Sequence, residues 1–81
     1  MAYWIENCRH CGQGRLFVFW DLTNRRPYLH CEECEWGWLS PDDLSIGGGF
    51  LTLDEDFRAR PATTEEVAAA GWMGLVKEES G

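Results

Sequence analysis

The sequence predicts a small α+β fold, in which a three-stranded antiparallel sheet between two cysteine pairs carries a short helix docked near its C-terminal end. The four cysteines form two C-x2-C pairs, and the stretch between them has strand and turn character. A capping box then begins a helical segment late in the chain. A chain of 81 residues builds only a small core, and such domains generally need a metal ion or disulfides for stability. We therefore expect residues 1–81 to form a single metal-stabilised domain.

The cysteine pairs are Cys8-Arg-His-Cys11 and Cys31-Glu-Glu-Cys34, with nineteen residues between them. This spacing is typical of a structural zinc site, because two intervening residues let one tight turn present both thiolates to one ion. We therefore predict that all four cysteines bind a structural Zn²⁺, with iron as the alternative ion. Only the first pair is followed by glycine, at Gly12, so only this pair is expected to have the complete turn.

Other uses of the cysteines stay open at this point. They could form two disulfides or be unrelated buried thiols. His10 and His30 each lie next to a cysteine and could replace a thiolate as a metal ligand. The first fifteen residues have no apolar segment of a secretory signal, so we expect a cytoplasmic location, where disulfides are disfavoured. No apolar run reaches the ~20 residues of a membrane-spanning helix.

Strands are expected at Leu16–Trp20, Tyr28–Cys31 and Trp36–Leu39, since these runs are rich in aromatic and β-branched residues. A turn over residues 23–27 separates the first two. We call each cysteine pair with its turn a knuckle. The order knuckle, strand, turn, strand, knuckle, strand over residues 5–40 resembles a zinc ribbon. The resemblance implies the three-stranded fold but no particular function, because such folds serve many functions.

Residues 41–62 are expected to be a glycine-rich connection. Pro41–Leu44 has the pattern of one helical turn, with Ser40 before it. Three glycines at 47–49 indicate a loop, and residues 50–53 could add an edge strand, followed by the acidic residues 54–56.

Residues 63–77 are expected to hold the helix and the tail. Thr63 and Glu66 form a capping box, and Gly71 lies where a residue in the left-handed backbone conformation would end the helix. A helix this short is unstable alone, so it must dock on the sheet. The expected contacts are Val67, Trp72, Leu75 and Val76.

The aromatic residues divide between two sheet faces. In a strand, Phe17 and Phe19 share one face, and Trp36 and Trp38 share one face. Either set could pack under the helix or stay exposed as part of a binding surface.

The charge is strongly negative, with 7 lysines and arginines against 14 acidic residues. Residues 1–30 hold four arginines and two acids, whereas residues 31–81 hold three basic and twelve acidic residues. A net charge of −7 repels phosphate backbones. An acidic surface instead favours association with a basic protein.

The chain also resembles the small acidic immunity proteins encoded beside bacterial polymorphic toxins. The resemblance rests on size, acidity, the stretch Glu-Glu-Cys-Glu-Trp-Gly-Trp at 32–38 and the segment at 63–72. It implies a protein that binds and neutralises one basic or nucleic-acid-acting protein, without nucleic acid or membrane as partner. The candidate contacts are Glu32, Glu33, Glu35, Trp36, Trp38, Asp42 and Asp43.

Two other function classes stay open, and we expect no catalysis. A nucleic-acid or transcription-associated ribbon would use a basic and aromatic face made of Arg9, Arg15, Arg25, Arg26, Phe17, Phe19 and Tyr28. A rubredoxin-like electron carrier is suggested by the two cysteine pairs and by Cys11-Gly12, although Glu35 stands where that family repeats glycine. The sequence has no nucleophile–base arrangement, and four cysteine ligands leave zinc no open position.

Overall fold

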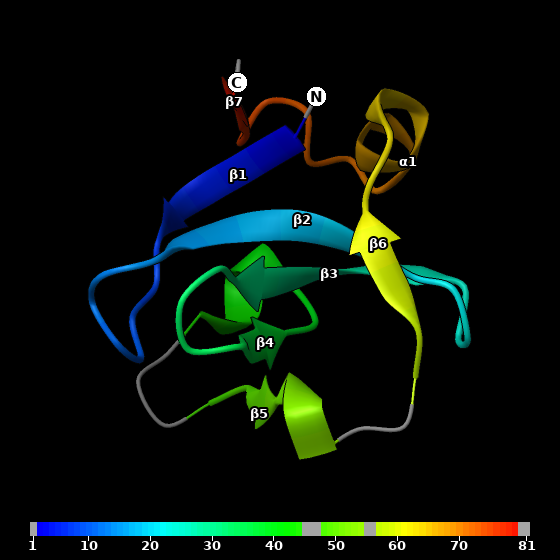
Figure 1. Ribbon diagram of the computed structural model, residues 1–81. Coiled ribbons are helices and arrows are strands. Elements are labelled where there is room, and N and C mark those ends of the chain that lie inside the picture. The colour runs from blue at the N-terminus through cyan, green and yellow to red at the C-terminus, as the bar shows by residue number, and fades with distance from the viewer. Residues whose placement is uncertain (1, 45–47, 55–56, 80–81) are drawn as a thin grey trace.

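The computed structural model describes residues 2–44, 48–54 and 57–79. Within these residues, seven strands form one antiparallel sheet in the order β5-β4-β3-β2-β1-β7, with β6 also paired to β2 (Figure 1). In the same described residues, a single α-helix packs on this sheet. The strands are β1 (Ala2–Asn7), β2 (Arg15–Asp21), β3 (Arg26–Cys31), β4 (Trp36–Trp38), β5 (Phe50–Leu51), β6 (Ala59–Pro61) and β7 (Lys77–Glu79).

The hairpin of β2 and β3 is the centre of the sheet. Its register pairs Leu16 with Cys31 and Phe19 with Tyr28. The first half of β2 pairs with β1 on its other edge, and the last three residues pair with β6. The two strands expected here are therefore confirmed, and β4 forms as expected apart from its last residue.

One face of the sheet is the hydrophobic core. Alternate residues of β2 and β3 point into it, and Leu16, Val18 and Leu29 are at most 1% exposed. Trp38 lies opposite Leu29 and is also 1% exposed. Phe17 and Phe19 lie on the other face of β2, together with Tyr28 and His30 of β3. The core therefore takes Trp38, while the phenylalanines line the second face.

The helix α1 (Thr64–Ala69) closes the core face. Thr63 and Glu66 form the expected capping box, and Gly71 has a φ of 79° just after the helix. Trp72 N donates to the carbonyl of Val67, as this helix end requires. Val67 is fully buried, and Trp72 and Val76 pack against the core. Leu75 is 52% exposed, so its expected core contact is wrong.

The sheet is larger than the three strands that the sequence predicts. β1, β6 and β7 come from segments for which no strand was expected, and β6 and β7 have three residues each. The three-residue segments β6 and β7 carry no periodic signal of their own, and their backbone pairing to a long neighbour makes them strands. β1 has six residues with alternating burial, and its Tyr-Trp-Ile run is the strand signal that could have predicted it. The expected edge strand 50–53 ends at Leu51, where a 3₁₀ helix, η2 (Thr52–Asp54), begins.

The connection after β4 contains the expected helical turn as the 3₁₀ helix η1 (Pro41–Asp43). The Ser40 hydroxyl accepts from the Asp42 N–H and caps this turn. The sequence also predicts a glycine loop at 47–49 and an acidic segment at 54–56. Of these positions, 47, 55 and 56 lie outside the described residues.

Candidate metal centre

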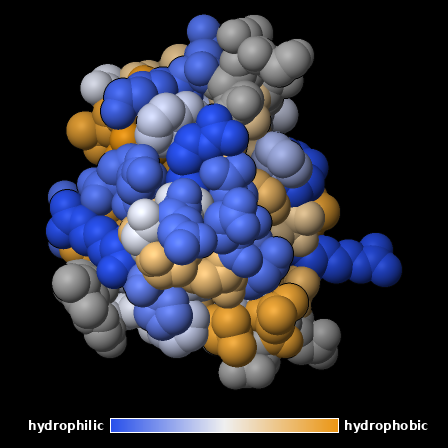
Figure 2. Space-filling model, turned by 60° about the vertical axis from the view of Figure 1, so that its left-hand side comes forward, coloured by the Kyte–Doolittle hydropathy of each residue, from blue (hydrophilic) through white to orange (hydrophobic). Residues whose placement is uncertain are grey.

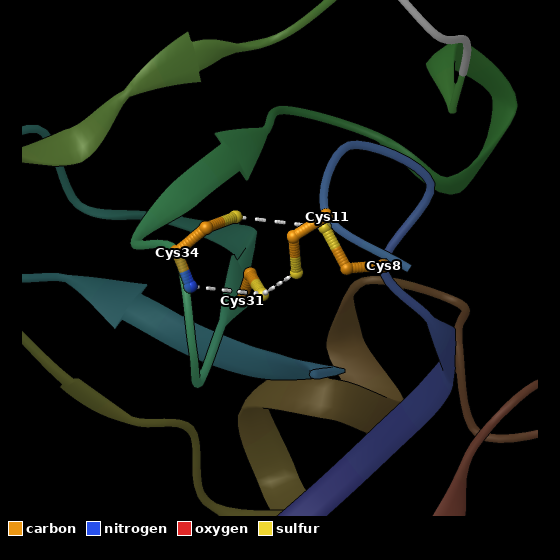
Figure 3. Close-up of side chains that lie close together, drawn as sticks. All are labelled: Cys8, Cys11, Cys31 and Cys34. Carbon is orange, nitrogen blue, oxygen red and sulfur yellow. Dashed lines mark hydrogen bonds between the residues drawn. The ribbon is translucent and has the colours of Figure 1, made fainter. Parts of the chain in front are cut away.

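The four cysteines come from two loops at the same end of the β2–β3 hairpin. Cys8 and Cys11 lie between β1 and β2, Cys31 ends β3, and Cys34 lies in the turn before β4. The Cys8 N–H donates to Gly14 O at 2.7 Å and closes the first loop, and the Glu32 N–H donates to Arg15 O at 3.1 Å and ties the second loop to β2. The hairpin register thus brings residues from the two pairs to one point (Figure 3).

The sulfur positions match a tetrahedral ion. All four Sγ atoms lie within 4.8 Å of one another. Cys8 Sγ is 3.7 Å from Cys34 Sγ, and Cys11 Sγ is 3.7 Å from Cys31 Sγ (Figure 3). Four sulfurs at ~2.3 Å from a tetrahedral Zn²⁺ would be ~3.8 Å apart, whereas a disulfide needs about 2.05 Å. The four cysteines are therefore positioned to hold a metal ion, and all four are free thiols.

Backbone N–H groups surround the sulfurs. The His10 N–H donates to Cys8 Sγ at 3.3 Å, and the Glu33 and Cys34 N–H groups each donate to Cys31 Sγ at 3.4 Å. These bonds stabilise thiolates and orient them toward the centre of the cluster. A thiolate is the form that a metal ion binds.

The pKa values of the thiols diverge for physical reasons. Hydrogen bonds from the backbone at Gln13 and Gly14 lower the pKa of Cys11 to about 6. Burial raises the pKa of Cys31 to about 12, although two backbone N–H groups act in the opposite direction, and burial also raises the pKa of Cys34. A divalent cation supplies the positive charge that would keep these buried sulfurs ionised.

Gly14 makes room for the cluster. A Cβ at this position would lie 2.7 Å from Cys31 Sγ and 2.8 Å from Glu33 Cγ. These separations are shorter than van der Waals contact at about 3.5 Å. Any larger residue here would displace a ligand sulfur or the second knuckle.

The two knuckles end with the same backbone conformation, which corrects the expectation that only the first is complete. Gly12 follows Cys11 with a φ of 73°, and Glu35 follows Cys34 with a φ of 65°. A left-handed conformation at a residue other than glycine costs about 1–2 kcal/mol. Two bonds hold the second knuckle in place: Thr52 N and the Thr52 hydroxyl both donate to Glu35 O.

Neither histidine joins the cluster. The His10 ring stacks on Trp36 with centroids 4.2 Å apart, which connects the first knuckle to β4. His30 Nε2 lies 3.0 Å from Glu35 Oε2, and His30 Nδ1 lies 3.0 Å from the Tyr28 hydroxyl. Burial lowers the pKa of His30, with Glu35 opposing that shift. This Tyr28–His30–Glu35 chain has no signal in the sequence, because only the register of β3 and the second knuckle brings it together.

The candidate partner contacts occupy different environments. Glu33, Asp42 and Asp43 are exposed and make no ion pair within the described residues. Glu32 binds Arg15 and Glu35 binds His30. Trp36 is half-buried and donates through Nε1 to Gly48 O, and Trp38 is buried in the core. A partner could not reach Trp38 without opening the core.

No protein-family model, curated protein or solved structure matches this chain. In the part of the chain that the structure describes, no helix is long and apolar enough to cross a membrane. The fold and the site define a small antiparallel sheet protein with one short helix and four cysteines placed to hold a metal ion.

Proposed function

We propose that this protein is a non-catalytic zinc-binding interaction module of the zinc-ribbon type, which binds and neutralises one basic partner protein. The sulfur geometry is the observation that supports the metal part of this proposal. Four thiolates fill a tetrahedron and leave no position for substrate or water, so a Zn²⁺ held here would act on stability and not on chemistry. Cys8 and Cys31 are 2% and 0% exposed, which also limits access to the ion.

Iron is the alternative metal, as in rubredoxin-like electron carriers. Metal analysis of the purified protein separates the two ions, with one zinc per chain expected. A ferric tetrathiolate site is red, whereas a zinc site is colourless, so a red preparation would contradict the zinc assignment and favour electron transfer.

The distribution of ion pairs supports an acidic binding surface. Within the described residues, four arginines form ion pairs: Arg9 with Glu6, Arg15 with Glu32, Arg26 with Asp21 and Arg60 with Glu66. Each of these pairs is neutral, so the acidic side chains outside them determine the charge of the protein surface. Glu33, Asp42 and Asp43 are exposed and unpaired within the described residues.

These three exposed acids lie in or near the two knuckles. Glu33 lies in the second knuckle, and η1 lies beside the first knuckle, because Arg9 Nη1 donates to Leu44 O at 2.7 Å. Figure 2 brings forward the side on which the loop between β1 and β2 lies, and hydrophilic residues cover most of its middle. The exposed acids Glu33, Asp42 and Asp43 would make this hydrophilic side negative, and a negative surface steers a basic protein during association.

The test is an affinity capture from the source cytoplasm with zinc-loaded protein. We expect one basic protein at near-stoichiometric yield, and its loss with the triple variant Glu33→Gln, Asp42→Asn, Asp43→Asn. The matched control is the double variant Glu65→Gln, Glu78→Gln, which removes exposed acids outside the knuckle region and should retain the partner. Equal capture by the triple variant, or no basic partner at all, would contradict the proposal.

A nucleic-acid-binding function is a second candidate, favoured by the cations on the second sheet face. The Arg15 guanidinium lies 5.0 Å from the Phe17 ring centroid, and Lys77 Nζ lies 4.7 Å from that of Trp4. Arginine and aromatic side chains together are typical of single-strand binding. A salt titration against single-stranded and duplex oligonucleotides tests it, and an absence of binding at low salt would exclude it.

A further inference from the structure

The second face of the sheet carries a pocket that the metal centre does not use. Its volume is about 380 Å³. β2 and β3 form its floor, the second knuckle and η2 form one side, and the approach to β6 forms another. The lining residues that carry chemistry are Phe19, Tyr28, His30, Glu35, Thr52 and Phe57.

The aromatic rings of the pocket hold one another in place. The Phe19 ring stacks on His30 with centroids 4.5 Å apart and an interplanar angle of 11°. Phe57 meets Tyr28 edge-on at 5.4 Å. Rings packed in this way are pre-organised, and their negative faces attract cations.

One carboxylate gives the pocket its charge. Oε2 of Glu35 lies 3.0 Å from His30 Nε2, and Glu35 Oε1 has no partner among the described residues. The Glu35 side chain is 41% exposed, so it is accessible from solvent. The pKa of Tyr28 is raised by burial first, and also by the negative charges of Asp21 and Glu35, which agrees with a negative potential in the pocket.

The same sheet face contains a guanidinium group bound by an aromatic ring and a carboxylate. Phe17 lies two residues before Phe19 on β2, and the Arg15 guanidinium lies over its ring. The same guanidinium donates hydrogen bonds to both carboxylate oxygens of Glu32, at 2.8 and 3.2 Å. The chain thus supplies ring, carboxylate and guanidinium at Phe17. At Phe19 it supplies rings and the Glu35 carboxylate, and within residues 2–44, 48–54 and 57–79 no arginine or lysine of its own occupies that position.

We propose that this pocket binds the guanidinium group of an arginine side chain from the basic partner, with the ring faces of Phe19 and Phe57 and the carboxylate of Glu35 as its contacts. A planar guanidinium both stacks on aromatic rings and donates two hydrogen bonds to a carboxylate, whereas an ammonium group does only part of this. The inference rests on the proposed function for the source of the arginine, and the pocket itself can be tested without that partner.

The test titrates zinc-loaded, ¹⁵N-labelled protein with N-acetyl-Gly-Arg-Gly amide and follows amide chemical shifts. The matched probe carries citrulline, which has the shape of arginine without its charge. We expect saturable shifts at the amides of Phe19, Tyr28 and Phe57 with the arginine peptide, and binding at least about tenfold weaker with citrulline. Equal shifts with both peptides, or no shifts at these amides, would overturn the inference.

Three variants complete the test. Glu35→Gln removes the charge and keeps the shape, and should weaken arginine binding about tenfold. Glu65→Gln removes an exposed charge outside the pocket and both knuckles and should leave the affinity unchanged. Zinc content and amide dispersion verify that each variant is folded, and a Phe57→Leu variant, which leaves the knuckles untouched, gives a second readout if Glu35→Gln does not fold.

The outcomes separate this inference from the proposed function. If the arginine peptide binds but no basic protein is captured, the pocket stands and the proposed function fails. If a basic partner is captured equally well by wild type and by Glu35→Gln, the proposed function stands and the pocket inference fails.

Discussion

The tightest steric constraint at the candidate metal centre is at Gly14, and its replacement by alanine gives a quantitative test. The new methyl group would lie 2.7 Å from Cys31 Sγ and 2.8 Å from Glu33 Cγ, so one of them must move. In the metal-free protein the thiol can swing away, whereas in the metal-bound protein its place is required by the ion. The substitution should therefore act on metal affinity more than on the fold.

The magnitude follows from the cost of overpacking. Extra atoms in a well-packed site cost about 1–3 kcal/mol, which corresponds to an affinity about 5- to 150-fold weaker. Competition with a chromogenic zinc chelator under reducing conditions measures this change. The spectrum of Co²⁺-substituted protein reports whether the tetrahedral thiolate geometry survives.

The control is Gly12→Asn in the same knuckle. A Cβ at Gly12 meets nothing within 4 Å, and asparagine tolerates its φ of 73°. Its zinc affinity should fall less than that of Gly14→Ala, because the substitution strains the backbone slightly and displaces no ligand sulfur. The steric reasoning is refuted if Gly14→Ala binds zinc as tightly as wild type, or if Gly12→Asn weakens binding more than Gly14→Ala does.

Three further predictions concern stability. Removing the metal with a strong chelator under reducing conditions should abolish amide dispersion and shift tryptophan emission, because a structural zinc site contributes about 10–16 kcal/mol; unchanged spectra would mean that the sheet does not depend on the ion. Glu66→Gln keeps the capping box but loses the charged pair with Arg60, so urea unfolding at pH 7 should show a loss of about 0.5–1 kcal/mol, with none for the neighbouring exposed Glu65→Gln. Arg60 lowers the pKa of Glu66 to about 2 from the ordinary 4.5, so the contribution is complete above pH 4.5 and disappears as the pH falls toward 2, where wild type and Glu66→Gln should converge. Arg25 is exposed and has a φ of 56°, so Arg25→Gly should raise the free energy of unfolding by about 0.5–1 kcal/mol, and a lower melting temperature would contradict the proposed backbone strain.

Much of the local structure could be predicted because its signals act within a few residues. The capping box of Thr63 and Glu66, the left-handed Gly71 and the turn after Ser40 each depend on neighbours at fixed offsets. The grouping of the cysteines followed from their spacing for the same reason. The aromatic run in β2 was long enough to show its strand character.

The second knuckle shows where such signals fail. No glycine follows Cys34, yet Glu35 adopts the left-handed conformation because its carbonyl accepts two bonds from Thr52. Thr52 lies seventeen residues away, and its approach requires Gly37, where a Cβ would lie 2.9 Å from Thr52 Cγ2. A long-range contact here overrides the local preference.

By itself, the sequence determined a chain with paired thiols, an acidic balance, a central hairpin and one capped helix, because each depends on composition or on residues close in the chain. The tertiary structure alone decided that β6 and β7 extend the sheet, that Trp38 is buried, and that Glu35 meets His30 at an aromatic pocket. The physical reason is that strand pairing and burial depend on which distant segments share one small core. No spacing within a single segment carries that information.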